Sequence, residues 1–175
     1  LLLTALSKGS TCRFIDPTNE NTIAIMKATE HSTHFTVYLK EDDARTELMS
    51  IQYKSYDCVR PRSMSLQLHP TVHNSPYLAR FNTQNDFVPL DTLTFPEKLV
   101  SKKPKKGPLG LWSLNYGKRK IISSIKNAIL IDKNNNEYII IGKVSDNSLL
   151  VEAVNGLHYL CVLAVAITSF LNAKP

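Results

Sequence analysis

Short segments in which apolar and polar residues alternate dominate the chain. Met64 to Leu68 alternates cleanly with a period of two, and Leu48 to Tyr53 does so in part. That period is typical of strands with one buried face. Further segments with this pattern or rich in β-branched residues are 35–38, 112–116, 121–125, 128–131, 138–141 and 149–154. Polar turn sequences at 132–136 and 145–148 separate some of them, so the pattern predicts an antiparallel sandwich or barrel.

The longest apolar run, Leu157 to Leu171, lies at the C-terminus. It is shorter than the roughly 20 residues that a helix needs to span a bilayer. Residues 160–167 show no polar stripe, which predicts a helix buried on nearly all sides. A closed antiparallel barrel has an apolar interior that such a helix can fill. The alternative is an α+β sandwich with the helix packed across one face.

Composition places the chain among soluble globular domains. It has 175 residues, of which 43% are hydrophobic and 21% charged. These values exclude a disordered chain, a collagen-like chain and a polytopic membrane protein. We expect a single domain over 1–175. Because no initiator Met is present, we also expect it to be the C-terminal part of a longer protein.

The charge balance favours an anionic partner. Lys and Arg number 21 against 15 for Asp and Glu, a formal net charge of +6. Such an excess suits lipid headgroups, nucleic acid or acidic proteins and does not choose among them. Ten of the 21 basic residues fall within 98–133, where Asp132 is the only acid. Within this block the segment 97–110 also contains Pro and Gly, and we predict a basic, flexible loop there.

No motif for catalysis or metal binding emerges. Three widely spaced cysteines, Cys12, Cys58 and Cys161, fit a reducing compartment and buried, inert thiols. His69 and His73 have a helical metal-ligand spacing, but Pro70 interrupts it and no third ligand is near. Nucleophile elbows, Walker loops and zinc-protease motifs are not found. We therefore expect no metal, no cofactor and no enzymatic activity.

A family resemblance appears in the C-terminal third. Its residues are Ser113-Leu114-Asn115-Tyr116, Arg119, Ser124-Ile125-Lys126-Asn127, Tyr138-Ile139-Ile140, Gly142-Lys143-Val144 and the apolar run 157–170. Upstream matches at 16–18, 35–38, 61–64 and 78–81 follow in the same order. The chain resembles the tubby C-terminal domain. The resemblance implies a mainly β fold with one central helix, a closed antiparallel β-barrel of about 12 strands filled by the hydrophobic C-terminal α-helix.

The resemblance also implies a ligand. The family binds phosphoinositides, chiefly phosphatidylinositol 4,5-bisphosphate, at a shallow basic pocket. Lys27 and Arg62 match two basic positions of that pocket. Ile25 stands where the family has a second Lys, and losing one charge-assisted contact costs about 1.5–3 kcal/mol. Lys8, Lys54 and Arg60 are auxiliary basic residues that we expect to compensate; Ser10 lies near the position of a family Asn.

From these observations we expect the chain to be a phosphoinositide-binding adaptor domain that docks on membranes. The expected location is the cytoplasm, peripheral at the plasma or ciliary membrane, with the nucleus as an alternative, and the expected process is protein transport. We expect a monomer whose protein partners bind through flanking regions. One alternative is a protein-interaction scaffold whose lipid pocket has eroded, which Ile25 favours. The other is a nucleic-acid-binding, transcription-linked role.

Overall fold

The computed structural model describes residues 4–29, 33–41, 44–54, 62–69, 96–154 and 157–171. These residues form twelve strands and one helix, α2 (Tyr159–Leu171). The strands are β1 (Thr4–Lys8), β2 (Thr11–Ile15), β3 (Thr22–Ala28), β4 (His34–Glu41), β5 (Ala44–Tyr53), β6 (Met64–Leu68), β7 (Lys98–Ser101), β8 (Lys105–Lys106), β9 (Trp112–Ser113), β10 (Ala128–Ile131), β11 (Glu137–Ser145) and β12 (Ser148–Ala153).

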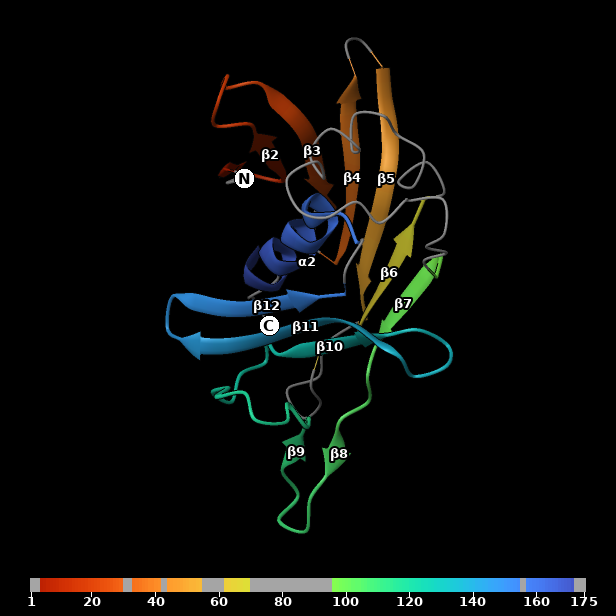
Figure 1. Cartoon of the computed structure of the whole chain (residues 1–175), viewed down its shortest axis with the longest axis vertical. Helices are drawn as coiled ribbons and strands as arrows, with labels where there is room; N and C mark the ends of the chain where they lie inside the picture. The colour runs from red at the N-terminus through yellow and green to blue at the C-terminus, as the bar shows by residue number, and fades with distance from the viewer. Residues whose placement is uncertain are drawn as a thin grey trace.

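Ten strands form one antiparallel sheet whose order follows the chain. The order is β1-β2-β3-β4-β5-β6-β7-β10-β11-β12, and β8 pairs with β9 in a separate ribbon. The sheet curves so that α2 lies on its inner side (Figure 1). A mainly β antiparallel fold with a C-terminal helix is thereby confirmed. Among the described residues β1 and β12 end the strand order, so closure into a barrel stays a prediction.

Alternation along the strands builds the core. In β6, Met64, Leu66 and Leu68 are buried on the inner face, as the period of two predicts. In β10 all four residues are buried. Ala128 and Leu130 belong to the inner core, whereas Ile129 and Ile131 form a second cluster with Ile140 on the outer face. Leu114 and Tyr116 cover that second cluster.

The helix packs one side against the sheet. Its buried residues are Leu160, Cys161, Ala164, Val165, Ala166, Thr168 and Ser169. Val162, Leu163 and Ile167 are half-buried, and Phe170 and Leu171 at the end are exposed. The helix predicted over 157–171 is confirmed over 159–171, but burial on all sides is not, because its last turn reaches solvent. Within the described part of the chain, no helix has the length and apolar character needed to cross a membrane.

The segment 97–110 is not wholly the loop that its lysines, prolines and glycines predict. Residues 98–101 form β7, which pairs with β6 on one side and β10 on the other. Residues 105–106 form β8. The predicted strand at 112–116 shortens to the two residues of β9, and the one predicted at 121–125 reduces to a single bridge between Ile122 and Lys143. The family-like segment 78–81 lies outside the described residues.

The segment before β10 is held against β11 by close packing and hydrogen bonds. A Cβ placed on Gly142 would lie 2.3 Å from Cδ1 of Ile121, so the glycine makes room for that side chain. Asn127 accepts a hydrogen bond from the Lys143 amide (2.7 Å) and donates one to the Ile122 carbonyl (2.8 Å). The contact between this segment and β11 therefore involves three residues of the family resemblance: Asn127, Gly142 and Lys143.

Candidate functional site

A line of directly opposed residues crosses the outer face of the sheet. Lys8 lies opposite Thr11, Thr11 opposite Lys27, and Lys27 opposite Thr36. Opposed residues on neighbouring strands project from the same face, and neighbouring strands lie about 4.8 Å apart. Lys8 and Lys27 are exposed, while the flanking Cys12 and Met26 are buried beneath the sheet. The line continues across β5, β6 and β7 through Ser50, Gln67 and Lys98.

A further cation lies in the next row of this face. Arg13 lies opposite Ile25, two residues from Thr11 on β2, and is exposed. Lys8, Arg13 and Lys27 therefore form what we call the outer basic cluster. Among the residues that the structure describes, no salt bridge involves any of the three. The hydroxyl groups of Thr11 and Thr36 lie in the same row as Lys27.

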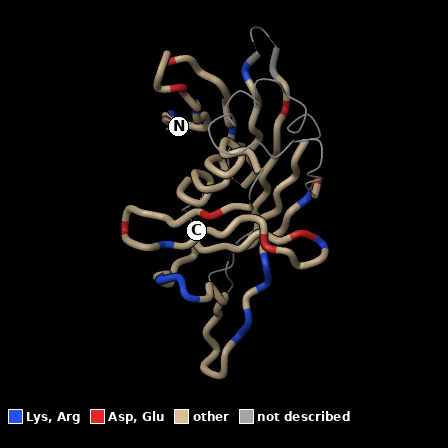
Figure 2. Tube along the Cα trace, viewed as in Figure 1, with Lys and Arg blue, Asp and Glu red and all other residues tan. Residues whose placement is uncertain are grey.

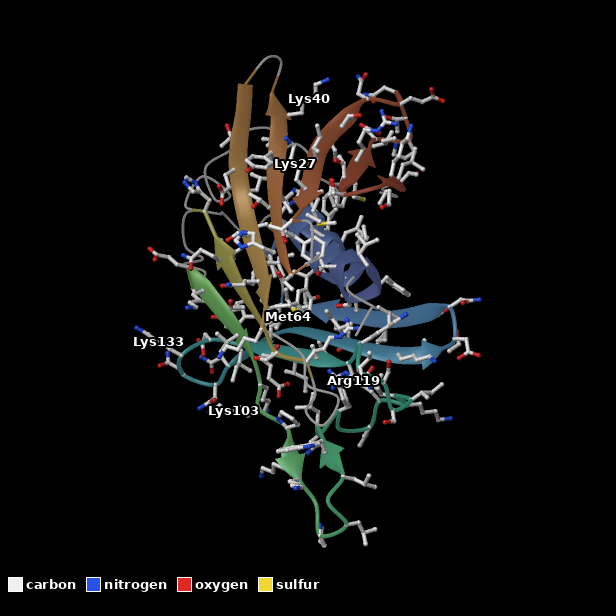
Figure 3. All side chains as sticks on the ribbon, turned by 180° about the vertical axis from the view of Figure 1, so that it is seen from behind. Lys27, Lys40, Met64, Lys103, Arg119 and Lys133 are labelled. Carbon is white, nitrogen blue, oxygen red and sulfur yellow. The ribbon has the colours of Figure 1, made fainter. Side chains whose placement is uncertain are left out.

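The surroundings of the cluster are mixed in charge. Lys40 is exposed on the same face of β4, and Figure 3 shows it beyond Lys27 in the view from behind. Tyr38 lies opposite both Ile25 and Glu47, which brings one exposed carboxylate to the far side of the row. Excess positive charge thus gathers at the β1–β4 side of the outer face.

Arg62 occupies a different place. The Lys54 amide donates to the Ser63 carbonyl (2.8 Å), which extends the β5–β6 ladder by one step. Arg62 thus follows the alternation of Met64, which faces inward, and its Nη1 atom is buried. The structure therefore does not place Arg62 on the same face as Lys27. Lys54 is exposed and lies beyond the end of β5, and Arg60 lies outside the described residues.

The inward position brings Arg62 near a buried phenol. Burial raises the pKa of Tyr53, while hydrogen bonds with Thr168 and Ser169 and the positive charge of Arg62 act in the opposite direction. The Tyr53 hydroxyl lies 2.9 Å from Oγ1 of Thr168. Arg62 thus neighbours a polar group that links β5 to α2.

A small pocket opens on the inner side of the same strands. Its volume is about 100 Å³, below the roughly 300 Å³ at which ligand pockets begin. Among the described residues, its lining includes Ser7, Ser10, Thr11, Met26, Phe35 and Leu171, and no charged side chain. This pocket does not suit a phosphorylated ligand, so the outer basic cluster is the candidate site.

The cluster has the donors that a phosphorylated ring requires. Arg13 offers a planar fork of donors, Lys8 and Lys27 offer compact charges, and the threonines offer hydroxyls. Sequence reasoning selected Lys8 and Lys27 but missed Arg13 and Thr11. Only the cross-strand register reveals these two, because neither is near Lys27 in the sequence.

The cysteines carry no comparable chemistry. Cys12 and Cys161 are buried free thiols, as predicted, and burial raises the pKa of Cys161 to about 12. A thiol with so high a pKa is almost wholly protonated at neutral pH and is a poor nucleophile. Cys58 and His73 lie outside the described residues.

A curved antiparallel sheet around a C-terminal helix defines a mainly β domain. A sequence model of the Tub family matches residues 12–172, and the chain therefore belongs to the Tub family. The resemblance to the tubby C-terminal domain is thereby confirmed over nearly the whole chain. No curated protein matches the chain.

Proposed function

We propose that this chain is a non-enzymatic phosphoinositide-binding domain that docks on membranes through the outer basic cluster. The observation that carries the proposal is the pairing of Arg13 with Ile25. The family has a Lys at the position of Ile25, and Arg13 supplies a cation one strand away from it. A guanidinium at this place replaces the lost charge and adds a second donor for a phosphate.

The dimensions of the cluster support one phosphorylated ring as ligand. Arg13 and Lys27 are one strand apart and two residues out of register, which separates their Cα atoms by roughly 8 Å. Two long side chains at that separation reach a common anion. Lys8, two strands from Lys27 in the same row, extends the cluster to β1.

We retain Arg62 in this proposal as a secondary contact to the headgroup. Because Arg62 follows the inward alternation of Met64, a headgroup contact by Arg62 lies apart from the outer basic cluster and uses guanidinium nitrogens other than the buried Nη1. Lys54, Arg60 and the lysines of 98–106 strengthen the approach to an anionic leaflet, at about 1 kcal/mol for each basic residue near the surface. The proposed setting is the cytoplasmic side of the plasma or ciliary membrane, with the chain acting as a monomeric adaptor in protein transport.

The test is sedimentation with vesicles that contain phosphatidylinositol 4,5-bisphosphate, against vesicles of phosphatidylcholine alone, at physiological salt. We expect Lys27→Ala and Arg13→Ala each to weaken binding about tenfold to hundredfold. Lys133→Ala is the matched control, because Lys133 is exposed in the β10–β11 turn, away from the cluster (Figure 3). Arg62→Ala is measured together with its unfolding midpoint, so that a loss of fold is separated from a loss of binding.

Equal binding by the wild type and the Lys27→Ala/Arg13→Ala double variant would refute the assignment. In that case the scaffold function, which the substitution at Ile25 favours, becomes the leading candidate. A stoichiometric protein partner without lipid binding supports it. Affinity for duplex nucleic acid that falls steeply with salt supports the nucleic-acid role instead.

A further inference from the structure

The β8–β9 hairpin carries an exposed apolar tip. Lys105 pairs with Ser113 and Lys106 with Trp112, and residues 107–111 connect the two strands. Leu109 is 87% exposed, Leu111 70% and Trp112 38%. Single exposed apolar residues are ordinary, but three within four positions at the end of a projecting ribbon are a candidate interaction site.

The tip is conformationally fixed. The Gly110 amide donates to the Gly107 carbonyl (2.9 Å), and the Gly107 amide donates to the Leu111 carbonyl (2.8 Å). Pro108 sets its own φ for the first central position of the turn, and Gly110 adopts a positive φ of 76°. This arrangement is a tight turn followed by a left-handed glycine, one of the common hairpin connections. Little backbone conformational entropy is therefore lost when the tip binds a partner.

The base of the hairpin is anchored to the sheet. Beyond β9, Leu114 and Tyr116 pack on the outer isoleucine cluster of β10 and β11. Before β8, the Lys102 ammonium lies 2.6 Å from a carboxylate oxygen of Glu137. The ribbon consequently projects away from the sheet as an extension of the fold (Figure 1).

Three lysines lie beside the apolar tip, on the arm of the hairpin that contains β8. Lys103, Lys105 and Lys106 are exposed, and Nζ of Lys106 lies 5.8 Å from the centroid of the Trp112 ring. No Asp or Glu occurs anywhere in 98–131. Figure 2 shows basic residues along the arm of the hairpin that leads into β8, none on the β9 arm, and no acidic residue on either. From the tip inward, the leucines come first, then Trp112 level with Lys106, and then Lys105.

That order matches the layers of an anionic membrane surface. Aliphatic side chains favour the acyl region, indole favours the interface, and lysines favour anionic headgroups. We propose that the tip of the β8–β9 hairpin inserts into an anionic lipid bilayer, with Leu109 and Leu111 below the headgroups, Trp112 at the interface and the lysines on the phosphates. The inference rests on the proposed function in taking a membrane as the partner, but it involves other residues and needs no particular headgroup.

Trp112 makes the proposal directly testable, because it is the only tryptophan in the chain. The 175-residue chain is mixed with vesicles of phosphatidylcholine and phosphatidylserine without phosphoinositide, and with the same vesicles carrying brominated acyl chains. We expect the Trp112 emission to shift to shorter wavelength on binding and to be quenched by the brominated chains. Leu109→Ser/Leu111→Ser should weaken binding at least tenfold and abolish the shift, whereas Ile122→Ser, an exposed apolar control away from the tip, should change neither.

The outcomes separate this inference from the proposed function. Removal of a tip lysine, Lys105→Ala or Lys106→Ala, should weaken binding to these vesicles about fivefold. Lys27→Ala should leave the emission shift intact and remove only the gain in affinity that phosphatidylinositol 4,5-bisphosphate gives. The inference is overturned if vesicle-bound protein shows an unshifted, unquenched Trp112, if the leucine variant binds as well as the wild type, or if only duplex nucleic acid or an acidic protein alters the emission.

Discussion

Arg13 and Ile25 form one directly opposed pair between β2 and β3 on the outer face of the sheet. The pair places a guanidinium one strand away from residue 25, where the family resemblance implies a lysine. Under the proposed function, Arg13 supplies that charge from the neighbouring strand. The presence of Ile25 in place of a lysine is therefore weak evidence that lipid binding has been lost.

The pair predicts a rescue. Arg13→Ala should weaken binding to vesicles containing phosphatidylinositol 4,5-bisphosphate about tenfold or more, because one charge-assisted contact is lost. Arg13→Ala/Ile25→Lys should restore most of that affinity, since the cation returns to the same row. Arg13→Ala/Ile25→Leu is the control and should stay weak. Co-sedimentation of the three variants with vesicles measures these affinities. If Ile25→Lys does not restore binding, residues 13 and 25 do not contribute to the same lipid contact.

The sequence could not reveal this pair because of a register shift. Ile15 lies opposite Thr22, so regular counting from the intervening turn would place Arg13 opposite Ala24. A bulge between Phe14 and Ile15 moves the pairing by one residue, and Arg13 meets Ile25 instead. β2 and β3 were not among the segments predicted from alternation, and the extra residue that decides their neighbours leaves no pattern in the sequence.

The buried hydrogen bond between β5 and α2 should contribute to stability. Thr168 donates its hydroxyl hydrogen to the Val165 carbonyl (2.8 Å), so the Tyr53 hydroxyl is the donor to Thr168. Tyr53→Phe should lower the free energy of unfolding by about 1 kcal/mol. For a domain of this size that corresponds to a decrease of about 2–4 °C in the unfolding midpoint.

Thermal unfolding of Tyr53→Phe, Thr168→Val and the double variant gives the coupling energy. Tyr38→Phe, a partly exposed tyrosine, is the matched control and should have little effect. Strictly additive losses from Tyr53 and Thr168 would show that the contact does not stabilise the fold.

The close approach of Ile121 to Gly142 should make that glycine hard to replace. Gly142→Ala would bring a Cβ within 2.3 Å of Ile121 and should cost about 1–3 kcal/mol of unfolding free energy. Ile121→Ala makes room, so the double variant should lose less than the sum of the single losses. Gly107→Ala, where the nearest atom would be at 3.5 Å, is the control. A Gly142→Ala variant as stable as the wild type contradicts the packing.

The Arg119–Glu152 pair should give an acid-sensitive contribution to stability. Nε and Nη2 of Arg119 donate to the two carboxylate oxygens at distances from 2.6 to 3.0 Å. Hydrogen bonding by Arg119 lowers the pKa of Glu152 below its ordinary value of 4.5. The contribution is therefore complete above the ordinary pKa and is lost as the pH falls through the lowered value.

The effect is small because the pair is partly exposed and salt screens it. In Glu152→Gln, the unfolding midpoint should fall slightly at pH 7 and differ from that of the wild type least at pH 3. Thermal melts across this range, at low and high salt, provide the check. A gap between variant and wild type that widens toward pH 3 is inconsistent with the pair.

Two local elements show where patterns along the chain stop being informative. In β7 only Leu99 is buried, so the strand is too short to display alternation; its identity comes from the partners β6 and β10 on either side. The segment 121–125 has the composition of a strand, yet Ile121 fills the space above Gly142 and the chain makes one bridge there. In contrast, residues 64–68 and 128–131 were predicted with the observed bounds, because the alternation of the first and the unbroken apolar run of the second mark them as strands.

The direct pairing of β7 with β10 has a consequence for the evolution of this fold. Ser101 meets Leu130 and Val100 meets Ile131, so the ladder is continuous although the β8–β9 hairpin lies between the two strands in the chain. Residues 103–113 leave and return without supplying a rung of the main sheet. Their length and chemistry can therefore vary among descendants under selection for the surface they meet, while the packing of the core constrains the remainder.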